Sequence, residues 1–311
     1  MPYIYIYFAA INLAAIILAL HDKSAARRRK WRVKESTLLL VSAFGGSIAM
    51  LLTMRIIRHK TQHKKFMIGV PVIIVLQTIA AISVAALFYF GVLHFNNPSK
   101  TDFPVRGVDV SSYQGEIDWQ TLSHQGIDFA YIKATEGSTF IDPYFEYNLT
   151  EALDTDLFVG AYHFFSFDSP AESQFENIIK VVQKNETLLP IAVDVEFYGS
   201  NHKNPPPKEG VMVELAILFE KLTEYYGKKP IIYALADSYD LYVSGRFMEY
   251  EIWYRDVISS PKISDGREFT FWQFSNRHRL DGYNGKEKYI DMNVFNGSFE
   301  KFETFAKGIT S

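Results

Sequence analysis

The first hundred residues contain three long apolar runs separated by basic segments. The runs cover residues 3–20, 36–54 and 67–93, which are 18, 19 and 27 residues long. A helix needs about 20 predominantly apolar residues to cross a bilayer, so the third run predicts a transmembrane helix and the first two are long enough for one each. The pattern therefore predicts an all-α transmembrane segment within residues 1–95.

The second apolar run has two possible arrangements. It is flanked on both sides by basic segments, with the sequences HDKSAARRRKWRVK and RIIRHKTQHKK. If all three runs cross the bilayer, one basic segment faces outward against the positive-inside tendency. With Gly45 and Gly46 at its centre, the run could instead enter the membrane and return as a re-entrant hairpin. That arrangement keeps both basic segments inside and sends the third helix outward.

From residue 105 onward, short apolar stretches typical of buried strands alternate with helical patterns. Helices are expected at residues 144–154, 171–184 and 208–226, the last closed by Gly227. Strands are expected at residues 107–111, 129–134, 158–164, 190–197, 230–234, 251–254, 269–274 and 289–292. This order predicts an α/β domain over residues 105–311, with a parallel sheet closed into an irregular (β/α) TIM-like barrel. Residues 96–104 are polar, contain two prolines, and predict a short linker that holds the barrel close to the membrane.

Charge divides the chain at the same place. Residues 1–99 contain 12 Lys or Arg and 2 Asp or Glu, whereas residues 100–311 contain 20 and 33. Basic segments interleaved with apolar runs favour a lipid bilayer as partner, and the acidic second part argues against nucleic acid. The chain has no cysteine, which excludes disulfides, thiol catalysis and cysteine-bound zinc.

One apolar stretch contains two carboxylates, in the sequence PIAVDVEFYG at residues 190–199. Successive side chains of a strand point to opposite faces, so Asp194, Glu196 and Tyr198 are expected to project together. A structural ion pair is one explanation of the two acids. The other explanation is that this strand forms the floor of an active site.

Polar and aromatic residues recur near the ends of the other expected strands. In a (β/α) barrel, the functional residues lie at the C-terminal ends of the strands. We therefore expect one site at the barrel mouth that contains Asp109, Glu136, Tyr162, Asp194, Glu196, Tyr198, Tyr233, Tyr254, Trp272 and Asp291. Trp272 and the tyrosines are candidate sugar-binding surfaces, and Glu136 could instead form an ion pair with Lys133.

Paired carboxylates among aromatic rings are typical of glycoside hydrolysis. Glu196 has the longer side chain and is the better candidate for the acid, whereas Asp194 is expected to remain ionised. Asp109 and Asp291 would raise the pKa of Glu196 by like-charge repulsion. The spacing of the two acids on the strand does not decide between retention and inversion.

Seven ordered motifs resemble those of glycoside hydrolase family 25 lysozymes. They are GVDVSSYQGEIDW, FAYIKATEG, VGAYHFF, DVE, IWYR, FWQFS and IDMNVFNGS, spread over nearly all of residues 105–305. The resemblance implies an N-acetylmuramidase that cuts the β-1,4 bond between N-acetylmuramic acid and N-acetylglucosamine in peptidoglycan, without metal or cofactor. It further implies that Glu196 is the general acid/base, Asp194 its partner carboxylate, and Asp109 and Asp291 supporting acids.

The role of Asp194 has two alternatives. It could attack the sugar as a nucleophile, or it could orient the 2-acetamido group of the substrate for internal attack. Tyr162 is expected to lie where it could hydrogen-bond that acetamide, which favours the second route.

The first part of the chain is similar to a family of small bacterial membrane proteins of unknown function. The similarity lies in the sequences KWRVKESTLLL, FGGSIAM and RHKTQHKKF, and it implies no activity. Together the two resemblances predict a hydrolase of the bacterial cell membrane, with its barrel on the extracellular side and peptidoglycan glycan strands as partner. The alternative is a catalytically silent cell-wall-binding module on a membrane protein.

Overall fold

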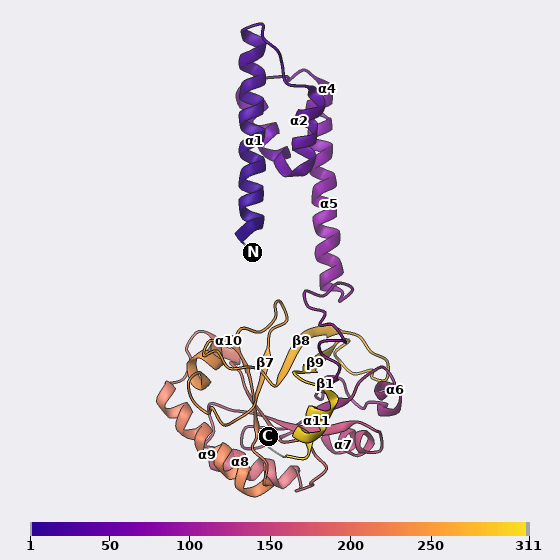
Figure 1. Cartoon of the computed structure of the whole chain (residues 1–311), viewed down its shortest axis with the longest axis vertical. Helices are drawn as coiled ribbons and strands as arrows, with labels where there is room; N and C mark the ends of the chain where they lie inside the picture. The colour runs from indigo at the N-terminus through magenta and orange to yellow at the C-terminus, as the bar shows by residue number, and fades with distance from the viewer. Residues whose placement is uncertain (1, 309–311) are drawn as a thin grey trace. The chain divides into compact units, whose positions relative to one another are not determined.

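The computed structural model describes residues 2–308, which form two compact units (Figure 1). Unit 1 ends at Val92 and is helical, and unit 2 begins at Leu93 and is mixed α/β.

Unit 1 is built from the three apolar runs. Its elements are α1 (Pro2–Arg27), α2 (Glu35–Val41), the π-helical turn η1 (Ser42–Gly46), α3 (Ser47–Ile56), α4 (Lys64–Met67) and α5 (Gly69–Tyr89). Three helical segments, Tyr3–Arg27, Glu35–Ile56 and Lys64–Tyr89, are long and apolar enough to cross a membrane. The sequence prediction of three candidate spans is confirmed at this level.

The middle segment is bent rather than straight. Phe44 and Gly45 leave the helical conformation, and Gly45 has a φ of 109°, which a residue with a side chain rarely adopts. The Lys60 ammonium, just beyond α3, lies 3.9 Å from the Glu35 carboxylate at the start of α2. The bend itself lies beside the N-terminal half of α1, where the Tyr7 hydroxyl donates to the Phe44 carbonyl at 2.7 Å. Helices α2 and α3 are therefore the two arms of a hairpin.

A polar side chain of α5 satisfies the backbone at this bend. Breaking a helix frees carbonyl groups that need new donors, above all in an apolar environment. The Gln77 amide nitrogen donates to the carbonyls of Ser42 and Ala43, at 3.0 and 2.8 Å, and its oxygen accepts from the Ser47 hydroxyl at 2.7 Å. Gln77 thus holds the hairpin bend against α5.

Unit 2 contains a closed barrel of eight strands. They are β1 (Arg106–Val110), β2 (Phe129–Glu136), β4 (Phe158–Phe164), β5 (Ala192–Val195), β6 (Ile231–Leu235), β7 (Ile252–Arg255), β8 (Phe271–His278) and β9 (Ile290–Phe295). The strand order is β1-β9-β8-β7-β6-β5-β4-β2, and pairing of β1 with β2 closes the ring. The short strand β3 (Phe140–Ile141) pairs only with β2 and lies outside the ring.

One strand departs from the expected parallel sheet. Strand β9 is antiparallel to both of its neighbours, β1 and β8. The prediction of a parallel sheet is wrong here, because residues 279–289 join β8 to β9 at the same end of the barrel instead of crossing to the other end. Reversal brings the start of β9, with Asp291, to the same rim as the C-terminal ends of the other strands.

Large apolar side chains fill the barrel at the N-terminal ends of its parallel strands. Phe129, Tyr131, Trp253 and Phe271 form one buried cluster, which Phe302 of α11 (Phe299–Ala306) completes. The opposite faces of the strands pack against five outer elements, which are α6 (Trp119–Ser123), α7 (Phe145–Leu153), α8 (Ala171–Val181), α9 (Lys208–Tyr226) and η3 (Tyr239–Val243). Two short elements, η2 (Gly199–His202) and α10 (Ala236–Ser238), follow β5 and β6 in the chain. The interior is solid at one end, so only the other end can open as a site.

The segment before β1 is attached to unit 2. The Asn96 side-chain amide donates to the carbonyls of Asp256 and Ser259, at 3.0 and 3.3 Å. The Arg106 guanidinium donates to the Pro98 carbonyl. Residues 96–98 are therefore held by unit 2 and are not a free linker.

Candidate active site

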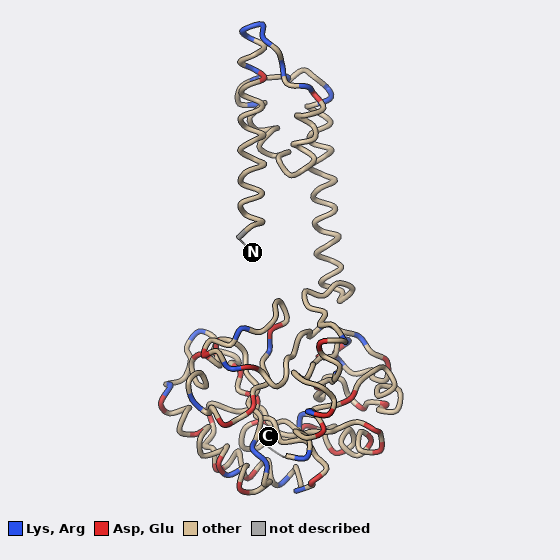
Figure 2. The backbone as a smooth tube through the Cα atoms, in the orientation of Figure 1, with Lys and Arg blue, Asp and Glu red and all other residues tan. Residues whose placement is uncertain are grey.

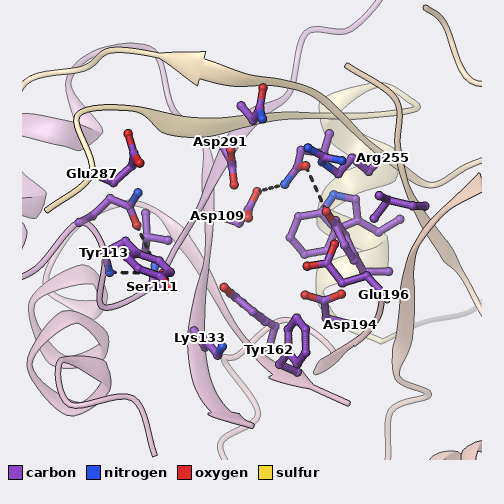
Figure 3. Close-up of a pocket in the computed structure, with 18 of the residues that line it drawn as sticks. Asp109, Ser111, Tyr113, Lys133, Tyr162, Asp194, Glu196, Arg255, Glu287 and Asp291 are labelled. Carbon is purple, nitrogen blue, oxygen red and sulfur yellow. Dashed lines mark hydrogen bonds between the residues drawn. The ribbon is translucent and has the colours of Figure 1, made fainter. Parts of the chain in front are cut away.

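A cavity of about 540 Å³ opens at the C-terminal ends of the parallel strands. Figure 3 shows the carboxylates of Asp109, Asp194, Glu196 and Asp291 projecting into it from three strands. Tyr162 from β4 and Tyr233 from β6 also line it. The structure thus brings together six of the ten residues expected at the mouth.

Asp109 and Asp291 face each other across the β1–β9 pairing. The Asp109 Oδ1 atom accepts from the Gln273 amide at 2.9 Å and from the Asn293 amide at 2.7 Å. Burial, followed by the charge of Asp109, raises the pKa of Asp291 well above its usual value. Burial also raises the pKa of Asp109, although its two amide donors oppose the rise. The pair is therefore expected to share a proton near neutral pH.

Asp194 and Glu196 lie on and just beyond β5. Burial and then the charge of Glu196 raise the pKa of Asp194 well above its usual value. Burial also raises the pKa of Glu196, and the positive charge of Arg255 partly opposes this. The Asp194 Oδ1 atom is buried and has no hydrogen-bond partner within residues 2–308.

The raised pKa of Asp194 differs from the expectation that this carboxylate remains ionised. Asp194 lies deeper than Glu196, and its burial, without a donor to Oδ1 within residues 2–308, favours its protonated form. A ligand that donated a hydrogen bond to Oδ1 would favour the carboxylate instead. The proton held by the Asp194–Glu196 pair is then expected to move to Glu196.

Two cationic side chains of the cavity were not identified from the sequence. Lys133 on β2 forms an ion pair with Glu136, with 2.7 Å between nitrogen and oxygen. Arg255 is the last residue of β7, and its positive charge opposes the rise in pKa of all four acids. The sequence did contain a signal for Arg255. It is two residues after Trp253 on the same strand, so the two side chains project from the same face of the strand.

The two tyrosines of the cavity serve different partners. The Tyr233 hydroxyl donates to the Gln273 amide oxygen at 3.1 Å, and Gln273 donates in turn to Asp109. Burial and the surrounding carboxylates raise the pKa of Tyr162 well above its usual value, so its phenol stays neutral. Tyr162 thus keeps its hydroxyl proton and provides a hydrogen-bond donor at the cavity wall.

Tyr254 and Trp272 do not line the cavity, which corrects the prediction for both. They point outward into the core between barrel and helices. Trp272 packs against the rings of Phe103 and Phe269, and its indole nitrogen donates to the Asp256 carbonyl at 2.8 Å. Both faces of these strands are apolar and aromatic, so the sequence pattern did not show which face was interior.

Tyr198 and Glu136 also lie outside the cavity lining. The chain turns after β5, and the Tyr198 hydroxyl donates to Asp168 at 2.9 Å while accepting from the Phe167 amide at 3.1 Å. The alternation that would have placed Tyr198 beside Glu196 ends with the strand. Glu136 contacts the cavity only through its ion pair with Lys133.

The arrangement suits acid–base chemistry at a neutral substrate. It provides carboxyl groups whose pKa is raised by burial, an acceptor with no partner within residues 2–308, and a neutral phenol within one cavity. Within residues 2–308, no group of three His, Asp or Glu side chains is arranged to hold a metal ion.

Two family models match the chain. Residues 108–283 match the model for glycosyl hydrolases family 25. Residues 12–66 match a model for a family of proteins of unknown function, DUF1294.

Individual relatives agree with the first match. The uncharacterized protein YegX of Escherichia coli (strain K12) is 36% identical over 212 residues, covering 67% of this chain and 75% of YegX. Lysozyme M1 of Streptomyces globisporus is 28% identical over 210 residues, covering 62% of this chain and 68% of the lysozyme. A solved structure of a family 25 glycosyl hydrolase from Bacillus anthracis superposes with a TM-score of 0.65 at 50% identity, covering 69% of this chain and 98% of that one.

Proposed function

Because this chain belongs to family 25 of the glycosyl hydrolases, and is thus a glycoside hydrolase, we propose that it cleaves peptidoglycan between N-acetylmuramic acid and N-acetylglucosamine. The lysozymes and muramidases among its relatives support peptidoglycan as substrate. The observation that carries a 2-acetamido sugar as substrate is the buried Asp194 Oδ1 atom, to which the acetamide N–H can donate. The choice of bond is supported by the muramidases among the relatives.

In the proposed reaction, Glu196 protonates the leaving glycosidic oxygen and later accepts a proton from water. Asp194 accepts a hydrogen bond from the acetamide N–H, which orients the acetamide oxygen for attack on the anomeric carbon. This contact would favour the Asp194 carboxylate and leave the shared proton on Glu196, where protonation of the leaving group requires it. The neutral Tyr162 hydroxyl is the proposed partner of the acetamide oxygen.

Asp109 and Asp291 have a supporting role in this proposal. Asp109 is held on the cavity floor by the Gln273 and Asn293 amides, and the proposed sharing of a proton with Asp291 limits the charge of the pair. Arg255 balances the acidic cluster, so Glu196 can exchange its proton during the cycle. A catalytically silent wall-binding module would have no need for four acids held in this way.

The test is the identity of the sugar at the new reducing ends. Full-length protein in detergent is incubated with purified peptidoglycan, and the products are reduced with borohydride and identified by mass spectrometry. We expect reduced N-acetylmuramic acid, because the proposed cut leaves that sugar at the end. Reduced N-acetylglucosamine would show the wrong bond, and an absence of new ends would favour the binding module.

We further propose that residues 1–95 anchor the hydrolase in the bacterial cell membrane, with the barrel on the extracellular side. Helices α1 and α5 contain 26 and 21 residues, or about 39 and 32 Å at 1.5 Å per residue, against a hydrocarbon core of about 30 Å. Helices α2 and α3 contain 7 and 10 residues, so each arm spans only about 10 to 15 Å. The hairpin is therefore proposed to be re-entrant, with α1 and α5 as the two spans.

The absence of cysteine allows a direct test of this topology. Single-cysteine variants Tyr3→Cys, Lys30→Cys, Thr61→Cys and Asn97→Cys are treated with a membrane-impermeant maleimide on intact protoplasts. We expect labelling at positions 3 and 97 only, because a re-entrant hairpin places positions 30 and 61 together inside. Permeabilised cells, in which all four should react, provide the control. Three full spans would separate 30 from 61 and 3 from 97, which would contradict the proposal.

A further inference from the structure

The basic residues of unit 1 gather at one end of its helices. All twelve Lys and Arg residues of this unit lie in or next to the α1–α2 and α3–α4 connections, and the backbone coloured by residue type shows them at one end (Figure 2). Ten of them are exposed, and we call these ten the basic face: Arg27, Arg28, Arg29, Lys30, Arg32, Lys34, Arg55, Arg58, Lys64 and Lys65. The hairpin produces this face, because it returns the second connection to the same end as the first.

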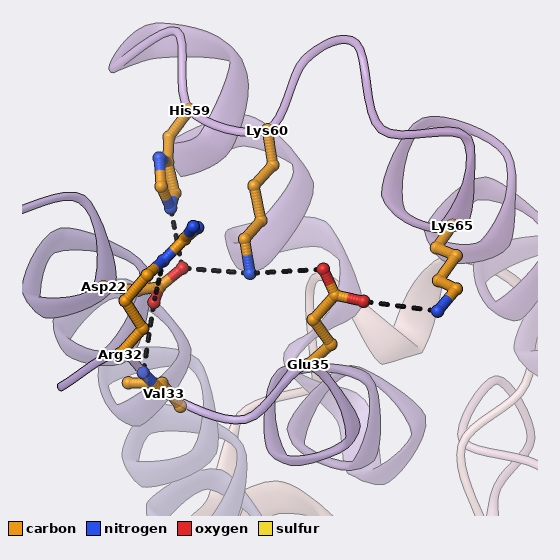
Figure 4. A network of polar contacts seen from close by, with 7 residues as sticks. All are labelled: Asp22, Arg32, Val33, Glu35, His59, Lys60 and Lys65. Atoms are coloured by element: carbon orange, nitrogen blue, oxygen red, sulfur yellow. Dashed lines mark hydrogen bonds and ion pairs between the residues drawn. The ribbon is translucent and has the colours of Figure 1, made fainter. Parts of the chain in front are cut away.

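A buried carboxylate joins the two connections (Figure 4). Asp22 at the end of α1 is fully buried and accepts from the Val33 amide of the first connection at 3.1 Å. From the second connection it binds the His59 ring at 2.8 Å and the Lys60 ammonium at 3.0 Å. The two connections are therefore fixed relative to each other, and the basic face is a defined surface rather than two independent loops.

The positive charge of this face is not neutralised within the unit. Asp22 and Glu35 are the only acidic residues among the first 99. Asp22 is occupied by His59, Lys60 and the more distant Arg32, and Glu35 lies within 4 Å of Lys60 and Lys65. Most of the basic face therefore lacks an acidic side chain and can attract external anions.

The surroundings of the basic face indicate which anion it meets. Exposed apolar side chains begin next to it, including Ile56, which is 80% exposed, and Ile68 at the start of α5. Trp31 is 96% exposed among the basic residues, and tryptophan is enriched at the boundary between hydrocarbon and headgroups. A soluble polyanion would use the charges alone and leave these apolar and aromatic neighbours without a role.

We propose that the basic face binds the phosphate groups of anionic phospholipids, in the leaflet opposite the hydrolase. This goes beyond the hydrolytic function and shares with it only the insertion of α1 and α5. Lys and Arg side chains at headgroup level attract anionic lipids in proportion to their number. The Asp22 network holds the charges of the two connections in one array, so that several of them engage the lipids together.

The test is lipid selectivity of the full-length protein. Protein in zwitterionic detergent is mixed with equal amounts of phosphatidylglycerol and phosphatidylcholine, and the lipid retained after removal of the excess is quantified by mass spectrometry. We expect enrichment of phosphatidylglycerol. The variant Arg28→Gln/Lys30→Gln/Lys34→Gln is expected to lower this enrichment roughly tenfold or more.

A matched variant controls for net charge. Lys184→Gln/Lys262→Gln/Lys307→Gln removes the same charge from exposed positions of unit 2 and should retain the enrichment. Unchanged peptidoglycan hydrolysis would show that unit 2 is folded in both variants, and an unchanged helical circular-dichroism signal in detergent would show the same for unit 1. Equal enrichment in the parent and in the Arg28→Gln/Lys30→Gln/Lys34→Gln variant would overturn the proposal.

Discussion

The Glu196→Gln variant is expected to lose nearly all peptidoglycan hydrolysis, with a decrease in kcat of roughly 10² to 10⁴-fold, the usual contribution of a general acid. Glutamine keeps the size of the side chain but cannot transfer the proton to the leaving oxygen. The burial of Glu196 and the raised pKa of its carboxyl are consistent with a group that carries this proton near neutral pH. The rate is measured as new reducing ends released from purified peptidoglycan by the full-length protein.

Glu209→Gln is the control for this experiment, because Glu209 is exposed in the first turn of α9 and lies outside the cavity lining. It should match the parent. The Glu196 variant should still bind peptidoglycan in a pull-down assay, since the rest of the cavity is intact. Retention of more than about a tenth of the parent rate would remove Glu196 from the acid role, given that a general acid contributes at least about 10²-fold.

The Asp194→Asn variant is expected to lower kcat by about 10² to 10³-fold, similar to the loss of one preorganised electrostatic contact. Asparagine preserves the shape but cannot provide the negative charge that stabilises the cationic intermediate of internal attack. The exposed Asp156→Asn change is the matched control and should leave the rate unchanged.

The substrate can distinguish the two roles of Asp194. Peptidoglycan whose muramic acid carries a free amine has no acetamide oxygen for internal attack. The parent enzyme is expected to cleave it poorly if Asp194 orients the acetamide. Rapid cleavage of this substrate, combined with a slow Asp194 variant, would instead identify Asp194 as the nucleophile.

The elements of unit 2 could largely be predicted from local sequence. Strand β4 has the expected bounds, and α9 runs over the expected residues and ends at Gly227 with a φ of 73°. Apolar periodicity and a glycine cap are local signals, so they survive without knowledge of the tertiary fold. The direction of β9 depends on whether the connection before it crosses the barrel or turns back. The local pattern does not show this, because residues 256–270 also lack a helix and yet β7 and β8 are parallel.

The site was predictable where polar residues interrupt an apolar strand. Asp194 and Asp109 could be placed because a carboxylate inside a buried strand must face a cavity or a partner. Trp272 and Tyr254 could not be placed, because an aromatic residue fits the filled barrel and the helical layer equally well. Arg255 was overlooked for the opposite reason, since a charged residue at a strand end is usually solvated.

The attachment of His94 to unit 2 determines how far the proposed enzyme can work from the bilayer. The His94 ring stacks on His278 and hydrogen-bonds the Ser275 hydroxyl, so only residues 90–93 separate the end of α5 from this fixed point. Fully extended, that tether reaches roughly 18 Å. Glycan strands beyond the innermost zone of the wall would stay out of reach however much enzyme the cell made. Under the proposed anchoring, the tether would act as a spatial limit on hydrolysis, confining cuts to the wall material beside the membrane and sparing the outer layers.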